Sequence, residues 1–251
     1  MIGIGFDIRN IHEGVLSSID IINLENPLYP NYLNGDYKSD ITNFTNKNYK
    51  KNVITDGAYI DLNPGTPEIE IKGIVKKKIL QSVNFAEATG SKEIIFLSTF
   101  LPMIGMGFYD NAHIENSAEF WRDVAIQTNI RISLCNTFEY EPSSLIKIAE
   151  LVKRDNFGLA FDIGHAFAYG KVSLREFYSR VFPYCQTVYI HSNNKCADEH
   201  LNLREGKLLE DNQFQDIIPL MRNMNILLKP FDKSRLYENL EVLRKILNSA
   251  V

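Results

Sequence analysis

The sequence predicts an α/β protein with a single (β/α)₈ fold, a TIM barrel, and two observations carry this prediction. The chain has 251 residues, close to the roughly 250 that one such barrel typically needs. Short apolar runs alternate with segments of helical periodicity, and no long linker interrupts them. Because repeated strand–helix units build a parallel sheet, we expect one barrel domain over residues 1–251.

Eight apolar runs are the expected barrel strands. Each is bounded by polar or turn-forming residues, and the unbroken run Ile94–Leu97 is typical of a strand buried on both faces. The expected strands are Ile2–Ile8, Ile19–Leu24, Val53–Tyr59, Ile94–Leu97, Ile130–Cys135, Gly158–Asp162, Thr187–His191 and Ile226–Lys229.

Helical periodicity fills most of the segments between these runs. After the third run, Thr66 is the expected N-cap of a helix with Pro67 at its first position, and Gly90 is expected to end it. Ser173 with Glu176 forms a capping-box pattern for a later helix. The apolar stripe expected on the first of these helices is Ile71, Ile74, Val75, Ile79 and Val83.

The segment 26–52 has the poorest helix signals, because it is rich in Asn, Tyr and Lys. We expect an irregular loop with one short helix, lying over the mouth of the barrel. An open dinucleotide-binding sheet is disfavoured, because no GxGxxG follows the first strand and Gly3-Ile4-Gly5 falls inside it.

Composition narrows the classes of partner. A net charge of −4 disfavours nucleic acid, which binds basic surfaces. No apolar stretch approaches the ~20 residues of a membrane span, and no signal-peptide pattern opens the chain. Cys135, Cys185 and Cys196 are odd in number and lack CxxC spacing, which favours a reducing, cytoplasmic location.

Polar side chains close or follow several of the apolar runs. In a barrel of this kind the carboxyl ends of the strands form the active site, and buried polar groups need partners. Convergence on one pocket would supply those partners. The residues concerned are Asp7, Glu25, Asp56, Cys135, Asp162, His191 and Lys229, with Glu139, His165 and His200 shortly after a strand.

Four of these stretches together resemble the xylose-isomerase-like sugar phosphate isomerases and epimerases. The likeness runs from Val53 to the end of the chain and preserves the order of the motifs. The motifs are Tyr59-Ile60-Asp61-Leu62-Asn63-Pro64, Asn136-Thr137-Phe138-Glu139, Phe161-Asp162-Ile163-Gly164-His165-Ala166, and Tyr189-Ile190-His191-Ser192-Asn193-Asn194 with Asp198-Glu199-His200-Leu201.

The resemblance implies a sugar substrate and a divalent metal ion bound by a Glu, an Asp, a His and a Glu after strands five to eight. The metal would act as a Lewis acid, and the two glutamates would exchange protons with the carbon between two substrate oxygens. Asp162 and His191 match the second and third ligands, and His165 matches a substrate-binding histidine.

The two glutamates of the resemblance are absent. Cys135 and Lys229 stand at their positions, so standard metal-dependent epimerisation is not expected. The endonuclease branch fits less well, because its additional histidine ligands would fall near Asp56 and Leu97.

Three hypotheses follow. In the first, an isomerase- or epimerase-like enzyme without metal uses the ammonium of Lys229, paired with Asp162, in place of the cation. In the second, Cys135, Asp162 and His191 hold a metal, zinc rather than manganese, for hydrolase or lyase chemistry. In the third, the barrel binds a sugar without catalysis or has a regulatory role.

The first hypothesis is preferred. Across the three hypotheses the expected cofactor is either none or one divalent ion, Zn or Mn. The substrate would be a sugar, sugar phosphate or polyol, and the resemblance allows for a homo-oligomer. Catalytic roles are expected for Lys229, Asp162, His191 and Glu139. Substrate contacts are expected from His165, His200, Arg204, Asp56 and Glu25, with Arg204 and His200 placed to meet a phosphate.

Overall fold

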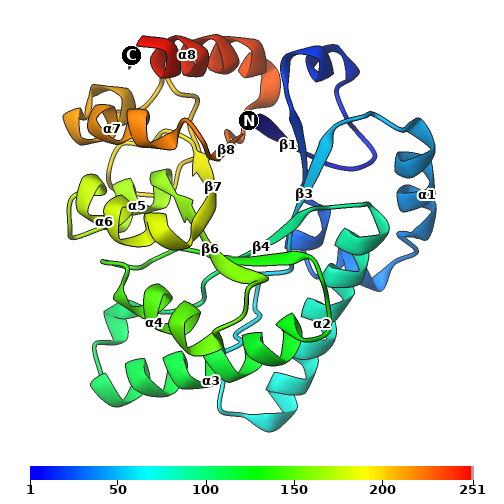
Figure 1. The fold of residues 1–251 in the computed structure, drawn as a ribbon, viewed down its shortest axis with the longest axis vertical. Coiled ribbons are helices and arrows are strands. Elements are labelled where there is room, and N and C mark those ends of the chain that lie inside the picture. Colours follow the sequence, from blue (N-terminus) through cyan, green and yellow to red (C-terminus); the bar gives the residue numbers. More distant parts are fainter. Residues whose placement is uncertain (250–251) are drawn as a thin grey trace.

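The computed structural model describes residues 1–249 and confirms the predicted barrel. Eight parallel strands pair in chain order, and the first closes on the last through Gly3 opposite Leu227 (Figure 1). The strands are β1 (Ile2–Phe6), β2 (Ile21–Leu24), β3 (Asn52–Asp56), β4 (Glu93–Leu97), β5 (Arg131–Cys135), β6 (Phe157–Asp162), β7 (Cys185–Ile190) and β8 (Asn225–Leu228).

Helices surround the strands as an outer ring (Figure 1). The α-helices are α1 (Lys38–Lys47), α2 (Ile69–Ala88), α3 (Gly107–Ala125), α4 (Ser143–Val152), α5 (Ile163–Tyr169), α6 (Leu174–Val181), α7 (Asn212–Ile217) and α8 (Leu236–Ser249). Short 3₁₀ helices are η1 (Glu13–Ser18), η2 (Asn26–Leu28), η3 (Tyr32–Asn34), η4 (Pro102–Ile104), η5 (Phe182–Tyr184), η6 (Leu208–Glu210), η7 (Ile218–Met221) and η8 (Lys233–Arg235).

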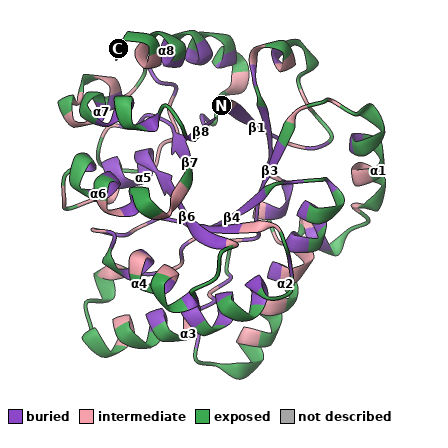
Figure 2. Cartoon of the chain, in the orientation of Figure 1, coloured by how far each residue is buried: buried purple, intermediate pink, exposed green. Residues whose placement is uncertain are grey.

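The core has two parts. The larger part fills the space between the strands and the helices, so the strands are buried while the outer helix faces are exposed (Figure 2). The smaller part is a cluster contributed by strands alone: Ile21, Ile54, Ile95, Cys135, Ala160, Tyr189 and Leu227. This second cluster fills the barrel interior, as side chains do in barrels of eight strands.

The helix-capping residues predicted from the sequence are confirmed with one exception. Ser173 Oγ accepts a hydrogen bond from Glu176 N, and Gly90 has the positive φ of 73° that suits a residue after a helix end. The N-cap of α2 is Glu68 rather than Thr66. Thr66 Oγ1 instead accepts from Glu68 N in a turn that precedes the helix.

The predicted apolar stripe on α2 is correct only in part. Val75, Ile79 and Val83 are buried, but Ile71 and Ile74 are exposed, and the buried residues of this helix begin only at Val75. The exposed positions therefore contribute nothing to the barrel core.

The segment 26–52 differs from its prediction. It contains the ten-residue helix α1, which buries Phe44 and lies in the outer ring rather than over the mouth (Figure 1). Leu28 and Tyr29 are the part of this segment that lines the pocket described below. The sequence carries no clear signal for the bounds of this helix, because a single buried aromatic residue produces almost no apolar periodicity.

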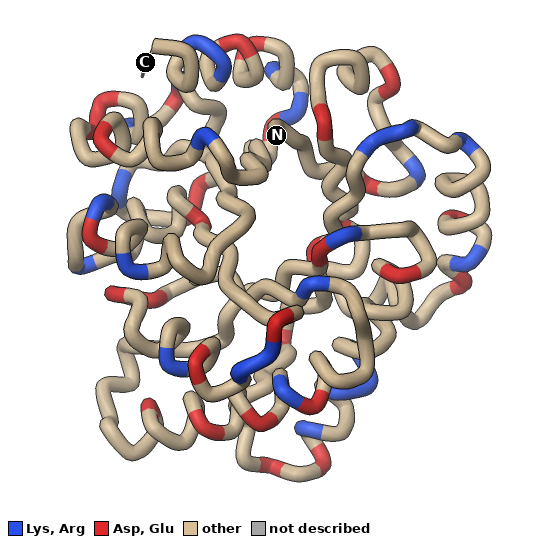
Figure 3. Tube along the Cα trace, in the orientation of Figure 1, with Lys and Arg blue, Asp and Glu red and all other residues tan. Residues whose placement is uncertain are grey.

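Charged residues of both signs are distributed over the outer helices and loops (Figure 3). Within residues 1–249, none of the helices combines the length and the apolar character needed to cross a membrane.

Candidate functional site

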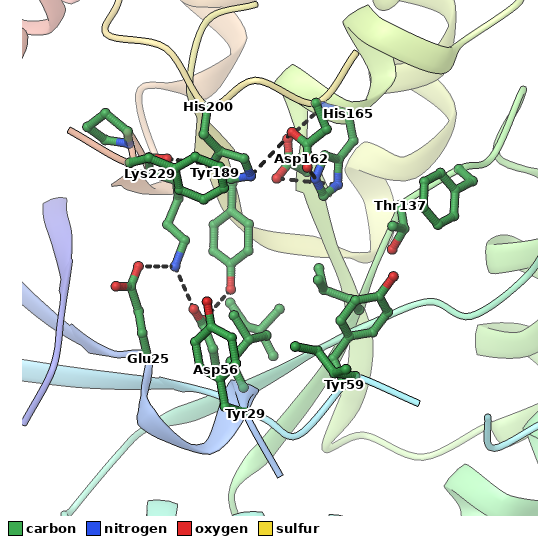
Figure 4. A pocket seen from close by; sticks show the side chains of 18 of the residues that line it. Glu25, Tyr29, Asp56, Tyr59, Thr137, Asp162, His165, Tyr189, His200 and Lys229 are labelled. Atoms are coloured by element: carbon green, nitrogen blue, oxygen red, sulfur yellow. Dashed lines mark hydrogen bonds and ion pairs between the residues drawn. The ribbon is translucent and has the colours of Figure 1, made fainter. Parts of the chain in front are cut away.

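A pocket of about 290 Å³ opens at the carboxyl ends of the strands. Its volume is near the lower end of the range for ligand pockets, so it suits one small molecule. Its apolar wall is formed by Leu28, Tyr59, Ile60, Ile95, Leu97 and Phe138. Its polar side chains form two groups on different sides, which we call the lysine cluster and the histidine cluster (Figure 4).

The lysine cluster consists of Asn23, Glu25, Asp56, Tyr189, Lys229 and Lys233. Lys229 Nζ donates to Glu25 Oε1 at 2.6 Å, to Asp56 Oδ2 at 2.5 Å and to Asn23 Oδ1 at 2.9 Å. An ammonium group has three N–H donors. All three donors of Lys229 are therefore used.

The acceptors of this cluster are also occupied. The second oxygen of Asp56 accepts from the Tyr189 hydroxyl at 2.5 Å and from Asn23 Nδ2 at 2.9 Å. The second oxygen of Glu25 accepts from Lys233 Nζ at 2.8 Å. Two cations and two carboxylates thus balance one another.

This balance fixes the protonation states. Burial opposes the charge of Lys229, but Asp56 and Glu25 outweigh burial and hold its pKa above the usual value. Burial likewise opposes ionisation of Glu25, yet Lys229 and Lys233 lower its pKa to about 2. At neutral pH Lys229 is an ammonium, so it is neither a base nor a nucleophile.

The predicted pair between Lys229 and Asp162 is wrong. Lys229 follows the end of β8 and turns toward the ends of β2 and β3; β8 pairs with β1, β1 with β2, and β2 with β3. Figure 4 shows the Lys229 amine beside Glu25 and Asp56, with Asp162 on the histidine side. The lysine therefore does not occupy the position of a cation bound by Asp162.

The histidine cluster consists of Asp162, His165, His191, Asp198 and His200. His191 Nε2 lies 3.0 Å from Asp162 Oδ1, and His165 Nε2 lies 3.1 Å from Asp198 Oδ2. The rings of His191 and His200 stack with centroids 3.7 Å apart. Three imidazoles and two carboxylates thus converge at the ends of β6 and β7.

Strand-end contacts position the first members of this cluster. Asp162 caps α5 by accepting from His165 N at 2.8 Å. Asn136 links the ends of β5 and β6, because its amide donates to Asp162 O and accepts from Asp162 N. The carbonyl of Asn136 also lies 2.8 Å from His165 Nδ1, which sets the orientation of that ring.

A folded-back loop brings the other members into place. After β7, Ser192 and Leu201 form an antiparallel bridge with two backbone hydrogen bonds of 2.8 and 3.0 Å. His200 therefore lies directly over His191, with a positive φ of 48°. Its Nδ1 lies 2.5 Å from the carbonyl of Lys229, which directs Nε2 toward the cluster.

Electrostatics in the histidine cluster differ from residue to residue. Burial opposes protonation of His165, but Asp162 and Asp198 raise its pKa to about 9. Burial opposes ionisation of Asp162, but His165 and His191 lower its pKa to about 2. Burial lowers the pKa of His191, so this ring is neutral at physiological pH.

Four of these residues have the chemistry and spacing of a metal site. Ligand atoms of His165, His191, Asp198 and His200 all lie within 4.8 Å of one another. Asp198 Oδ1 is buried and accepts no hydrogen bond from the described residues, although His200 Nε2 lies 3.2 Å away. A donor set of imidazoles and one carboxylate fits zinc or a similar divalent ion.

The predicted metal ligands are only partly in this group. His191 belongs to it. Asp162 instead holds the His191 ring and caps α5. Cys135 is fully buried among the apolar side chains of the barrel interior, and burial raises the pKa of its thiol well above the usual value. Cys135 packs in the barrel interior and is not among the residues that line the pocket, so its role as a metal ligand stays a prediction.

Two other predicted site residues, Glu139 and Arg204, do not line the pocket. Glu139 is buried, does not line the pocket, and turns back to accept from Thr137 N at 2.7 Å. Arg204 is largely exposed, lies 3.4 Å from Glu238 and does not line the pocket. By contrast Glu25, Asp56, His165 and His200 all line the pocket, and their contact with a substrate stays a prediction.

Sequence reasoning missed Asp198, Tyr189, Asn23 and Lys233 as site residues. Asn23 carried a signal, because it is a polar residue inside an apolar run. Asp198 carried one too, two positions before His200 in a quoted motif. Tyr189 and Lys233 gave none, since a strand tyrosine and a loop lysine are ordinary.

Comparison with known proteins places this fold in a family. A family model described as xylose isomerase-like TIM barrel matches residues 30–246, most of the chain. The chain belongs to this family. The match includes the whole histidine cluster and begins after Asn23 and Glu25 of the lysine cluster.

Several individual proteins are similar to this family member. The uncharacterized protein MJ1311 of Methanocaldococcus jannaschii is 23% identical over 169 residues, which cover 64% of this chain and 58% of that relative. This chain therefore spans little more than half the length of that relative.

Solved structures agree over nearly the whole chain. A D-tagatose 3-epimerase-like protein has a TM-score of 0.82 at 19% identity, covering 99% of this chain and 97% of the other. The TTHB071 protein from Thermus thermophilus, soaked with ZnCl₂, has a TM-score of 0.78 at 15% identity, covering 99% and 98%. Endonuclease IV from the same organism has a TM-score of 0.66 at 16% identity, covering 99% of each chain. At these identities the likeness shows the fold alone.

Proposed function

We propose that this chain is an isomerase- or epimerase-type enzyme that acts on a sugar or related polyol and binds one divalent metal ion in the histidine cluster. One observation carries the proposal: ligand atoms of His165, His191, Asp198 and His200 lie within 4.8 Å of one another, and Oδ1 of Asp198 is buried and accepts no hydrogen bond from the described residues. Family membership and fold neighbours described as epimerases support the substrate class.

The position of Lys229 supports a metal rather than a lysine as the cation of the site. A lysine ammonium near the histidines would repel a metal ion. Lys229 instead has all its donors engaged by Asn23, Glu25 and Asp56. The carboxylates that face it neutralise its charge, so it does not oppose a cation across the pocket.

The residues around the pocket would have different roles in metal and substrate binding. Asp162 fixes the orientation of His191, as carboxylates commonly do for metal-bound histidines. Asn136 O fixes Nδ1 of His165, so Nε2, which lies 3.1 Å from Asp198 Oδ2, is the nitrogen that would bind the metal beside Asp198. A bound metal ion would stabilise negative charge on substrate oxygens. Glu25 lines the pocket as an ionised carboxylate that can accept hydrogen bonds from hydroxyls.

Isomerases and epimerases break a C–H bond next to a carbonyl, which gives a direct test. The purified protein, loaded with Zn²⁺ or Mn²⁺, is incubated with D-fructose and D-tagatose in D₂O. We expect deuterium to enter the carbon beside the carbonyl, as seen by proton NMR. His200→Asn, which suits the positive φ of residue 200, should lose this exchange and remain folded.

A second candidate is a zinc-dependent hydrolase or lyase, which the three imidazoles of the cluster favour. Cleavage of a substrate without deuterium exchange would select this candidate. Binding of a sugar with neither exchange nor cleavage would overturn both enzymes in favour of a sugar-binding or regulatory barrel.

A further inference from the structure

We infer that the pocket selects an uncharged sugar or polyol and discriminates against its phosphate ester. This inference rests on the proposed function and adds the substrate class. It concerns the charges that line the pocket rather than the metal ligands.

The two lysines that line the pocket are already paired. Among the described residues, Lys229 and Lys233 are the lysine or arginine side chains of the lining. Lys229 donates to two carboxylates, and Lys233 donates to Glu25 Oε2 and to the carbonyl of Gly5. Lys233 Nζ has one further N–H donor, but Glu25 already balances its charge, so a phosphate would compete with Glu25 for this cation.

The histidine cluster offers no spare positive charge either. Both nitrogens of His165 have partners, Asn136 O at 2.8 Å and Asp198 Oδ2 at 3.1 Å. A divalent ion bound there would be balanced by Asp162 and Asp198. The pocket as a whole is therefore close to neutral with the metal bound, and acidic without it.

The places where barrels usually bind phosphate carry acidic groups here. In TIM barrels the phosphate commonly lies at the loops after strands seven and eight, at the N-terminus of a short helix. After β8 that helix is η8, and its N-terminus is capped by Asp232, whose Oδ1 accepts from Ser234 N at 2.8 Å. A carboxylate thus holds the position that a phosphate would need.

The arginines nearest in sequence to these loops are also engaged. Arg204 lies 3.4 Å from Glu238, and Arg235 donates to Glu205 at 2.9 Å. Neither arginine lines the pocket. Recognition of a phosphate by a bidentate arginine therefore has no candidate in the part of the chain that the structure describes.

Aromatic side chains at the pocket favour a neutral ring. Tyr29 and Phe231 line the pocket and are 58% and 70% exposed. Phe231 is held flat by stacking on His200 with centroids 4.3 Å apart. Exposed aromatic faces suit the C–H faces of a sugar, since burying them removes apolar surface from water.

Calorimetric titration of the metal-loaded protein with D-fructose and with D-fructose 6-phosphate tests this inference. We expect the ester to bind at least about tenfold more weakly than the free sugar. Glu25→Gln removes the carboxylate that pairs with Lys233 and with one donor of Lys229. Because these cations are then free to meet a phosphate, the ratio of the dissociation constants of ester and free sugar should fall by roughly tenfold. Glu205→Gln, which removes an acid outside the pocket, is the matched control and should leave the ratio unchanged.

Inorganic phosphate provides an arm that does not depend on the sugar. Phosphate should bind Glu25→Gln more tightly than it binds the wild type or Glu205→Gln. Equal or tighter binding of the ester by the wild type, or equal phosphate binding by all three proteins, would overturn the inference. Failure of the wild type to bind any free sugar, with phosphate binding gained in Glu25→Gln, would instead count against the proposed function.

Discussion

The two clusters use similar groups and differ in how completely those groups are satisfied. In the lysine cluster every donor of Lys229 and both oxygens of Asp56 have partners. In the histidine cluster Asp198 Oδ1 is buried without a hydrogen bond from the described residues. A satisfied buried network holds a structure together, whereas an unsatisfied acceptor among imidazoles marks a place for a ligand.

From the sequence Lys229 is the preferred centre of the site, whereas in the structure the histidine cluster is the better candidate for ligand binding. Lys229 is the residue that departs most clearly from the family pattern, and it suggested a cation at the centre of the chemistry. Its ion pairs hold its amine beside Glu25 and Asp56, so it does not take the place of a cation bound by Asp162. His165, His191 and His200, which keep the family pattern, belong to the group that could bind a metal ion.

The largest expected effect is the loss of the lysine cluster. Lys229→Met leaves the buried Asp56 without its cation and Glu25 with Lys233 alone, so it should lower the free energy of unfolding by about 3–5 kcal/mol. Urea denaturation measures this. Adding Asp56→Asn to the same chain should recover part of the loss. A stability equal to the wild type would show that the cluster is not structural.

The corresponding change in the histidine cluster should spare stability and remove metal binding. His200→Asn should weaken Zn²⁺ binding by roughly 100-fold, because one ligand is lost, while the urea midpoint measured without metal stays near the wild type. Competition with a chromogenic chelator measures the affinity. Unchanged affinity would place the metal elsewhere.

A smaller effect depends on pH. The pKa of Glu25 is lowered to about 2 in the folded chain, from an ordinary value of 4.5. Its stabilisation is therefore complete above about pH 4.5 and is lost as the pH falls toward 2. The stability difference between wild type and Glu25→Gln should be about 1–2 kcal/mol at pH 7 and should shrink across that window. A difference that is constant between pH 7 and pH 3 would contradict this assignment.

The smallest expected effect concerns Cys135. Cys135→Ala removes a buried sulfur from the barrel interior and should cost about 1 kcal/mol of stability. Metal affinity should not change. Weaker metal binding by Cys135→Ala would indicate that this thiol is a metal ligand and that the metal site extends into the barrel interior.

The fold could be predicted because periodicity reports burial directly. All eight strands and the capping of α6 by Ser173 follow from local patterns. A short helix is expected within 26–52, but the bounds of α1 and its place in the outer ring could not be predicted, because it buries little apart from Phe44. Sequence periodicity therefore predicts an element only where that element buries several residues along one face.

The site was predictable in its residues and not in its pairings. Strand position placed Glu25, Asp56 and His165 at the pocket. It gave no information on the direction of the long Lys229 side chain, which depends on acids of β2 and β3 far away in the sequence. Asp198 depends on the bridge between Ser192 and Leu201, which is a tertiary contact without a periodic pattern.

Metal content of the purified native protein tests the central claim most directly. Plasma mass spectrometry of wild type and His200→Asn, both purified without chelator and then dialysed against equal Zn²⁺ and Mn²⁺, gives the stoichiometry per chain. The account predicts close to one metal ion in the wild type and close to none in His200→Asn. A wild type without metal, or a variant that retains the full amount, would contradict it.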